Sequence, residues 1–276
     1  MIAWFNGELL PLDGVAIPAT DRGFLLGDGF FETMAVNSGK IVRFDDHMKR
    51  LSDTADKLSL PLPYSVEEIQ SGIHDVLVGN QLLKTRAAIR LTVTRGSGPR
   101  GLLPPLELKP QMLITAGEAP DHYPAASVKT VSVRRNEQSP TAGIKSLCYM
   151  DNIFAFEEAH KAGADEALML NTAGHIAEGT ITNIFFVKGD QLLTPKVSDG
   201  ALPGTARSAV IKTAAEIGMV VSEESLTPDI ITDCNEAFLT NSLCRVRVIH
   251  KLDGRQIPAQ AWADKILDAL KAGEST

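Results

Sequence analysis

The sequence has few cysteines and no excess of basic residues. Its 276 residues include three cysteines, Cys148, Cys234 and Cys244, and none is paired at the spacing of metal ligands. An odd number of scattered cysteines is typical of reduced thiols in a cytoplasmic protein, and we predict no metal site. The formal net charge is −7. This charge argues against nucleic acid as a partner, because phosphate binding needs a basic face.

Long apolar runs and targeting signals are also missing. Residues 1–8 contain neither a basic region nor a long apolar stretch, so we expect no signal peptide. No window approaches eighteen apolar residues, so we expect no membrane-spanning helix. We find no low-complexity segment and no repeat of solenoid period. What is present is 44% apolar and 22% charged residues, which allows a sizeable core in one large domain or two smaller ones.

The first part of the chain predicts strands, then helices, then a strand. Residues 30–36 and 40–43 flank the turn at 37–39 and predict a hairpin. One helix is expected to open at Asp45, and another at the capping box that Ser65 forms with Glu68. Alternating apolar residues then predict a strand over residues 89–94.

Short strands with a few helices recur in the second part. We expect strands near residues 128–133, 166–170, 181–187, 192–194, 236–240 and 245–250, and helices near 151–163, 205–217 and 259–270. This order predicts two α+β domains rather than a doubly wound parallel sheet. The predicted domains are residues 1–118 and 125–276, joined by a linker at 119–124.

Residues 96–101, Gly-Ser-Gly-Pro-Arg-Gly, match the pattern of a dinucleotide-binding loop. That fingerprint must open a helix, but Pro99 interrupts it and Leu-Leu-Pro-Pro follows at 102–105. We therefore predict no dinucleotide site. A loop that presents Arg95 or Arg100 to an anionic ligand and a plain solvent-exposed turn both remain open.

Lys145 and Glu178 carry the clearest chemical signal. Lys145 lies in the apolar stretch 143–149, where desolvation would favour the neutral amine, a nucleophile for a carbonyl. Glu178 lies in a β-rich apolar segment and is a candidate partner for a buried cation. Pyridoxal 5′-phosphate (PLP) would use both, the lysine for a Schiff base and the carboxylate at its pyridine nitrogen. The alternatives are a surface lysine and an ordinary turn glutamate.

A phosphate cradle is the third requirement of this cofactor. Gly204 and Thr205 come directly before a predicted helix, where free backbone N–H groups, a hydroxyl and the helix dipole favour an anion. The alternative is a simple helix cap. Arg50 on the first long helix and Ser242 after the strand at 236–240 could add a charge and a hydroxyl.

Together these residues resemble the class IV aminotransferases, the fold-type IV PLP enzymes. The resemblance runs from Asn6 to about Ile249, nearly the whole chain. The motifs occur in the family's order, at residues 21–23 with 27–33, 47–51, 144–147, 157–159 with 165–168, 178–180 with 183–185, 193–195 with 202–207, and 238–243.

The resemblance implies a fold and a set of roles. The fold would be a small α/β N-terminal domain and a larger pseudo-barrel C-terminal domain, in a homodimer whose neighbouring subunit completes the site. Lys145 would form the Schiff base and shuttle protons, and Glu178 would pair with the pyridine nitrogen. The phosphate would be held by Arg50, Thr205, Ala206 and Ser242, and Tyr149 would touch the phenolic oxygen. Cys148 stands where family enzymes often have asparagine, which leaves the tuning of that wall open.

Family members are transaminases or lyases that act on a small amino substrate with a carboxylate. Thr33, the loop at 94–101 and residues 239–243 look like those of 4-amino-4-deoxychorismate lyase, which forms 4-aminobenzoate and pyruvate for folate synthesis. Arg100 matches the arginine that D-amino acid transaminases use for a carboxylate. Arg245, with Arg247, could instead serve a dicarboxylate or keto acid. We expect the lyase first, a transaminase of D-amino acids, branched-chain amino acids or R-amines second, and a non-catalytic PLP-binding protein as a remote alternative.

Overall fold

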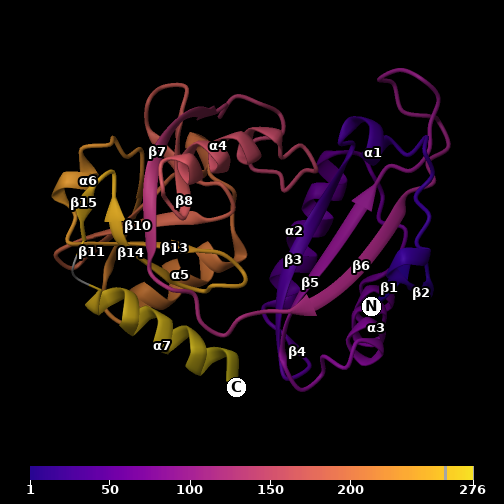
Figure 1. Ribbon diagram of the computed structural model, residues 1–276, viewed down its shortest axis with the longest axis horizontal. Helices are drawn as coiled ribbons and strands as arrows, with labels where there is room; N and C mark the ends of the chain where they lie inside the picture. Colours follow the sequence, from indigo (N-terminus) through magenta and orange to yellow (C-terminus); the bar gives the residue numbers. More distant parts are fainter. Residues whose placement is uncertain (258–259, 276) are drawn as a thin grey trace. The chain divides into compact units, whose positions relative to one another are not determined.

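The computed structural model describes residues 1–257 and 260–275, and it divides the chain into two compact units (Figure 1). The first unit comprises Met1–Asp121 with Ile144–Cys148, and the second comprises His122–Gly143 with the chain from Tyr149 onward. The sequence placed residues 144–148 in the second domain. They belong to the first unit because their backbone pairs with a strand far away in the sequence, as described below.

An antiparallel sheet forms the first unit. Its strands lie in the order β2 (Glu8–Pro11), β1 (Ile2–Phe5), β6 (Gln111–Glu118), β5 (Arg86–Thr94), β3 (Gly29–Asn37) and β4 (Lys40–Ile41). The expected hairpin is β3 and β4, and it turns at Ser38 and Gly39, which both have positive φ. The remaining elements of this unit are η1 (Leu12–Gly14), α1 (Arg22–Leu26), α2 (Phe44–Lys57) and α3 (Val66–Gly79).

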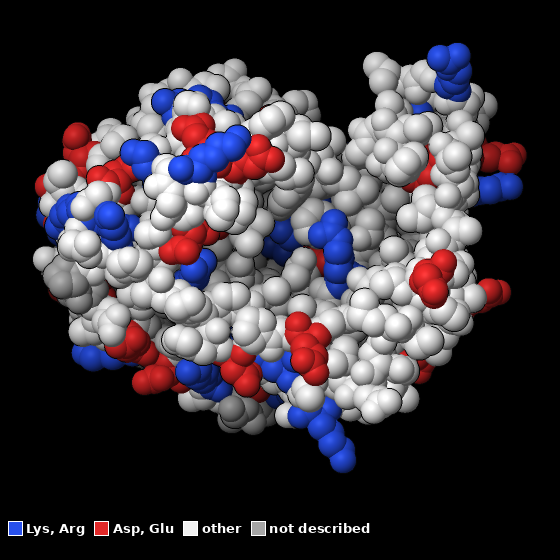
Figure 2. Space-filling model, in the orientation of Figure 1, with Lys and Arg blue, Asp and Glu red and all other residues white. Residues whose placement is uncertain are grey.

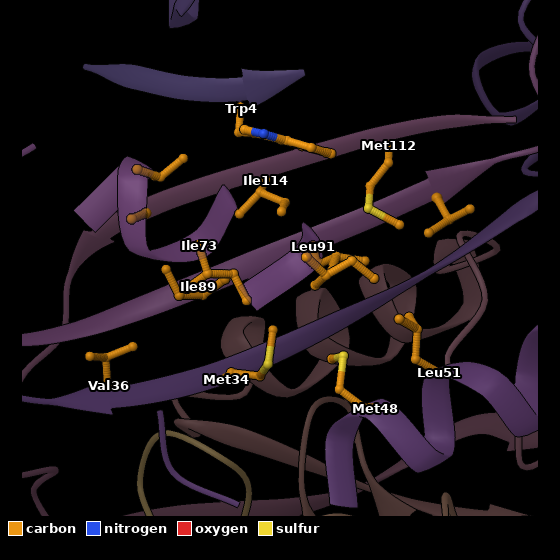
Figure 3. Packing of buried hydrophobic residues seen from close by; sticks show 14 of the residues in the cluster. Trp4, Met34, Val36, Met48, Leu51, Ile73, Ile89, Leu91, Met112 and Ile114 are labelled. Carbon is orange, nitrogen blue, oxygen red and sulfur yellow. The ribbon is translucent and has the colours of Figure 1, made fainter. Parts of the chain in front are cut away.

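Two helices pack on one face of this sheet. At the start of α3, Ser65 and Glu68 each bond the other's backbone N–H, as the capping box predicts. The core combines α2 and α3 with alternate residues of β3, β5 and β6 (Figure 3). Because successive strand residues point to opposite faces, Phe31, Thr33 and Arg90 lie on the face that is turned away from this core.

A curled sheet forms the second unit. Among the described residues its strands are β7 (Ala126–Arg135), β8 (Glu166–Asn171), β9 (Ile176–Gly179), β10 (Asn183–Lys188), β11 (Gln191–Pro195), β12 (Val220–Glu224), β13 (Glu236–Thr240), β14 (Arg247–Leu252) and β15 (Arg255–Gln256). The pairing order is β12-β11-β10-β13-β14-β7-β8-β9, with β15 beside β14. Only residues 180–182 connect β9, at one end of this order, to β10, near the other end, so the sheet must curl into a pseudo-barrel.

Apolar layers cover both faces of that sheet. The helical elements are α4 (Met150–Lys161), η2 (Val197–Asp199), α5 (Thr205–Glu216), α6 (Ile230–Asp233) and α7 (Ala261–Ser275). Phe185 of β10 packs with α5 and α7, and its neighbour Ile184 belongs to the opposite core. Burial on both faces explains the continuous apolar run of this strand. The expected helix start at Ala259 lies outside the described residues. Both units mix helices and strands, which confirms the α+β class.

The surface mixes charges of both signs. On the face in Figure 2, acidic and basic side chains are interspersed, and no extended field of one sign is visible there. Within the described residues, every helix is too short or too polar to cross a membrane.

Candidate active site

Lys145 is fixed at the edge of the first unit's sheet. Its carbonyl accepts a hydrogen bond from the Phe31 N–H at 2.9 Å, and the Leu147 N–H donates to the Gly29 carbonyl at 3.0 Å. The backbone is therefore held on both sides of the lysine. The side chain is half-buried, and its Nζ lies 4.4 Å from the centroid of the Phe31 ring. This anchoring needs glycine at position 29, because a Cβ there would lie 2.3 Å from the Val93 carbonyl oxygen.

A second cation shares the same aromatic ring. The Arg90 guanidinium lies 3.8 Å from the Phe31 centroid, a cation–π distance. Thr33 stands directly opposite Arg90 in the β3–β5 register, so both belong to this face of the sheet. The sequence reasoning missed Arg90, which looked like the polar side of an amphipathic strand. Its position opposite Thr33 follows from strand register, which the sequence does not display.

Arg50 is held by a buried carboxylate and a histidine. Its Nε and Nη2 donate to the two oxygens of Glu32 at 2.7 and 2.6 Å, and His47 Nδ1 lies 2.7 Å from Glu32 Oε2. Burial raises the pKa of the Glu32 carboxyl, but the hydrogen bonds from His47 and Arg50 outweigh it and hold this pKa at about 2. Burial also lowers the pKa of His47, so its neutral ring donates from Nδ1. The sequence predicted Arg50 and missed these two partners.

Glu178 is buried in β9 of the second unit. Its Oε2 accepts a hydrogen bond from the Leu202 N–H at 2.7 Å, and its Oε1 lies 3.2 Å from Arg135 Nη2. The arginine keeps the carboxylate charge-paired, and each oxygen can accept a further hydrogen bond. The short strand β9 was not expected, because four residues ending in glycine read as a turn.

The start of α5 lies close by in the same unit. Gly204 is the N-cap and has no side chain that could accept a capping hydrogen bond from the first turn of the helix. Thr205 and Ala206 in this turn are buried. A Cβ at position 204 would lie 2.3 Å from Asn183 Oδ1, so only glycine lets the chain pass here. Leu202, the residue that bonds Glu178, precedes this turn by three positions.

The remaining cofactor residues expected from the sequence belong to the second unit as well. Ser242 follows β13 in a turn where Asn241 Oδ1 accepts hydrogen bonds from the backbone N–H groups of Leu243 and Cys244. Tyr149 is the N-cap residue of α4, and it is half-buried. Their roles toward the cofactor stay predictions.

Three arginines that the sequence offered for substrate lie in different surroundings. Arg100 is exposed in the loop between β5 and β6, which opens no helix, as expected of a chance glycine pattern. Arg95 is buried and donates to Asp28 Oδ2 at 2.9 Å, so the idea that it faces an anionic ligand is wrong. Arg245 is buried against Glu274, with Nε and Nη2 both 2.7 Å from Oε2. This pairing gives Arg245 a structural partner, and its substrate role stays a prediction.

Taken unit by unit, the described residues include groups suited to each of the three parts of PLP. Lys145 supplies an amine, and the backbone on both sides of this residue is fixed by hydrogen bonds. Glu178 supplies a buried carboxylate that is paired with an arginine. The N-terminus of α5 has no side-chain cap, and a Cβ added at Gly204 would collide with Asn183 Oδ1. A helix start of this kind is suited to binding an anion. Across the described part of the chain, no group of three or more His, Cys, Asp and Glu side chains is arranged to hold a metal ion.

Comparisons with known proteins show the family of this chain. Residues 29–252 match the family Amino-transferase class IV. The chain is 35% identical over 260 residues to the "Putative branched-chain-amino-acid aminotransferase" of Methanocaldococcus jannaschii, which covers 93% of this chain and 90% of that protein. The structure is similar to a branched-chain aminotransferase from Thermoproteus uzoniensis, with a TM-score of 0.91, 28% identity, and coverage of 98% and 93%.

A lyase is among the similar structures too. The 4-amino-4-deoxychorismate lyase of Pseudomonas aeruginosa has a TM-score of 0.86 and 27% identity, with 98% of each chain covered. Fold and residues lead to the same family. The chain belongs to the class IV aminotransferases, the fold-type IV enzymes whose cofactor is pyridoxal 5′-phosphate.

Proposed function

We propose that the protein is a transaminase whose amino donor carries a carboxylate, with a branched-chain L-amino acid as the first donor to test. The observation that carries the proposal is the shared ring of Phe31. Lys145 Nζ and the Arg90 guanidinium lie 4.4 and 3.8 Å from its centroid, so the two cations are no more than about 8 Å apart. This upper limit places both cations within reach of one amino acid, whose amine and carboxylate are separated by a single carbon.

Each residue then has a defined task. Bound PLP supplies a carbonyl that condenses with amines and a ring that withdraws electrons. Lys145 Nζ would take the proton from the donor's α-carbon and return one to the product. The α5 N-terminus and Arg50 would hold the phosphate of bound PLP, and Glu178 would pair with its pyridine nitrogen. Arg90 binds the carboxylate next to the reacting carbon, where its planar fork suits two carboxylate oxygens.

Arg100 has a separate task in this proposal. Because it lies on an exposed loop, we assign it to the second carboxylate of a dicarboxylate acceptor such as 2-oxoglutarate. A guanidinium that stays charged at all working pH values suits this contact. Support for transamination also comes from the relatives, since the proteins from M. jannaschii and T. uzoniensis bear the name of branched-chain aminotransferases.

A spectral half-reaction tests the proposal. Wild-type enzyme and the Arg90→Gln variant are mixed with L-leucine, D-alanine, or an R-amine that has no carboxylate. We expect L-leucine to convert the wild-type cofactor to its pyridoxamine form. Arg90→Gln should slow this conversion roughly 10- to 100-fold, the effect of losing one charged hydrogen-bonding group. The rate with the amine should not change between the two enzymes. No conversion of the wild type with any amino donor would contradict transamination.

A second candidate is aminodeoxychorismate lyase, which the sequence placed first. Thr33 favours it through the resemblance of residues 31–33 to the lyases, and this residue stands opposite Arg90 in the β3–β5 register. The P. aeruginosa lyase of similar structure supports it as well. Aminodeoxychorismate is therefore one arm of the same screen. Release of pyruvate and 4-aminobenzoate, with no pyridoxamine form, would identify the lyase.

The proposal includes a homodimer. Large apolar side chains are exposed on both units, among them Phe24, Leu103 and Leu106 in the first and Ile153 and Phe154 in the second. Burying these side chains against a second copy of the chain would remove their apolar surface from water. Sedimentation equilibrium should give twice the 29.7 kDa chain mass. A monomer at micromolar concentration would overturn this part.

A further inference from the structure

The loop between β5 and β6 carries Arg100 and is tied at its start to the segment around α1. The Arg22 N–H donates to the Gly96 carbonyl at 2.9 Å, and the Gly98 N–H donates to the Thr20 carbonyl at 3.3 Å. Gly96 has a φ of +78°, and a Cβ there would lie 1.9 Å from the Lys109 carbonyl oxygen. The base of the loop is therefore narrow and fixed.

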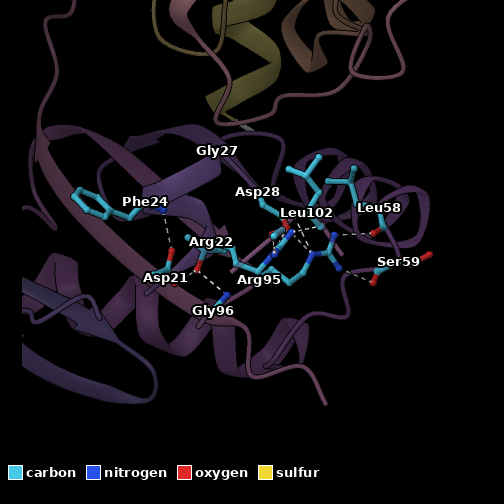
Figure 4. A network of polar contacts seen from close by, with 12 residues as sticks. Asp21, Arg22, Phe24, Gly27, Asp28, Leu58, Ser59, Arg95, Gly96 and Leu102 are labelled. Atoms are coloured by element: carbon cyan, nitrogen blue, oxygen red, sulfur yellow. Dashed lines mark hydrogen bonds and ion pairs between the residues drawn. The ribbon is translucent and has the colours of Figure 1, made fainter. Parts of the chain in front are cut away.

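The Arg22 side chain ties the same loop a second time. Its Nη1 donates to the Gly101 carbonyl at 3.1 Å and its Nη2 to the Leu102 carbonyl at 2.8 Å (Figure 4). Arg22 is buried, whereas Leu102 is 81% exposed. Side-chain packing therefore does little to fix the loop at Leu102. The two hydrogen bonds from the Arg22 guanidinium fix its backbone instead.

Asp28 holds Arg22 in place and also binds a second arginine. Arg22 Nε donates to Asp28 Oδ2 at 2.8 Å, and Arg95 Nε donates to the same oxygen at 2.9 Å. Burial raises the pKa of Asp28, but the hydrogen bonds from Arg95 and Arg22 outweigh it and lower the pKa overall. The Arg95 guanidinium then reaches the carbonyls of Ser59 and Leu58 at the end of α2, away from the loop.

We propose that Arg22 is a positioning residue that holds Arg100 ready for the far carboxylate of a dicarboxylate substrate. Arg100 directly precedes the two carbonyls that the Arg22 side chain binds. Only residues 99 and 100 lie between Gly98, which is bonded to Thr20, and Gly101, which is bonded to Arg22. Fixing the backbone in advance removes part of the ordering cost of binding. This inference rests on the proposed role of Arg100.

Trypsin measures the tether without any substrate. The Arg100–Gly101 bond is a tryptic site directly beside the anchored carbonyls, and mass spectrometry of fragments 1–100 and 101–276 reports its cleavage. We expect Arg22→Lys, which keeps the charge at Asp28 but loses the fork, to be cleaved there on the order of 10-fold faster than the wild type. Arg95→Lys is the matched control, because it makes the same change on the same carboxylate but leaves the loop contacts intact. Equal cleavage of the two variants would overturn the tether.

Kinetics test the positioning. In Arg22→Lys, the KM for 2-oxoglutarate should rise on the order of 10-fold, while the KM for L-leucine and kcat change little. Arg95→Lys should leave all three unchanged, and Arg100→Gln should raise the same KM at least as much as Arg22→Lys. An unchanged KM in Arg22→Lys would overturn the proposal, even if the loop is cleaved faster. Failure of transamination itself would appear separately, in the half-reaction of the wild type.

A second variant keeps the test valid if Arg22→Lys folds poorly. A Cβ on Gly98 would lie 3.0 Å from Arg22 Cδ, so Gly98→Ala displaces the arginine without removing it. We expect smaller changes in the same direction for cleavage and for the 2-oxoglutarate KM. A Gly98→Ala enzyme that matches the wild type in both would count against the proposal.

Discussion

Replacing Glu32 with glutamine should weaken the first unit and, through the phosphate role proposed for Arg50, lower the affinity for PLP. The carboxylate is 2% exposed and receives two hydrogen bonds from Arg50 and one from His47. Glutamine keeps the shape but removes the charge, and it offers one acceptor oxygen where two are used. Arg50 would then lose the partner that fixes its guanidinium.

The expected size follows from the pKa of Glu32. The folded value of about 2 lies below the ordinary value of 4.5, which corresponds to about 3 kcal/mol at neutral pH. That matches the lower end of about 3–5 kcal/mol for breaking a buried ion pair. A loss of this size should lower the melting temperature by about 6 °C in a chain of this length. The affinity for PLP should fall roughly 10-fold as Arg50 loses its orientation.

The dependence on pH gives a second readout. Because the folded pKa is depressed, the stabilisation is complete above about pH 4.5 and is lost as the pH falls toward about 2. Between these values the wild type should lose stability more steeply than Glu32→Gln.

The assay is thermal unfolding with a PLP titration, and the control is Asp53→Asn on α2, the helix that carries Arg50. Asp53 pairs with Lys49 at 2.8 Å on an exposed surface, so its loss should change the melting temperature little. If Glu32→Gln has the melting temperature of this control and the PLP affinity of the wild type, then Glu32 does not hold Arg50 in place for the phosphate.

Three further predictions address other residues. Gly204→Ala should weaken PLP retention in equilibrium dialysis at least 10-fold, because the new Cβ would lie 2.3 Å from Asn183 Oδ1. The control is Gly273→Ala, which should retain PLP because nothing lies within 4 Å of its new Cβ. Arg245→Lys should lower the melting temperature by a few degrees through its lost contact with Glu274 and leave KM values unchanged, whereas a raised KM would restore the substrate role predicted from the sequence. Iodoacetamide at pH 8 should label the exposed Cys148 and spare Cys244, because burial raises the pKa of the Cys244 thiol to about 11; peptide mapping that finds Cys244 labelled first would contradict the structure.

Local signals made much of the fold predictable. The capping box at Ser65 starts α3, and the turn at Ser38 and Gly39 joins β3 to β4. The strand at 236–240 has the predicted bounds. Each of these features depends on residues that are only a few positions apart. Their residue types and spacing are visible in the sequence, and these determine the local backbone geometry and hydrogen bonds.

Contacts between distant residues were the part that the sequence could not provide. The backbone of Lys145 pairs with β3, which lies more than a hundred positions earlier in the sequence. Residues 144–148 belong to the first unit because of this pairing. The sequence shows Glu32 only as part of the motif at residues 27–33, and its contact with Arg50 is seen only in the structure. Arg90 depends on strand register for its meaning, because the same alternation suits any half-buried strand.

The most direct test of the account is to find which amine carries the cofactor. The PLP-loaded enzyme is reduced with borohydride, digested and mapped by mass spectrometry, with Lys161→Ala as a control at an exposed lysine. We predict a single phosphopyridoxyl group, on Lys145, in both the wild type and the control. A label on another lysine, or cofactor released without any covalent label, would contradict it.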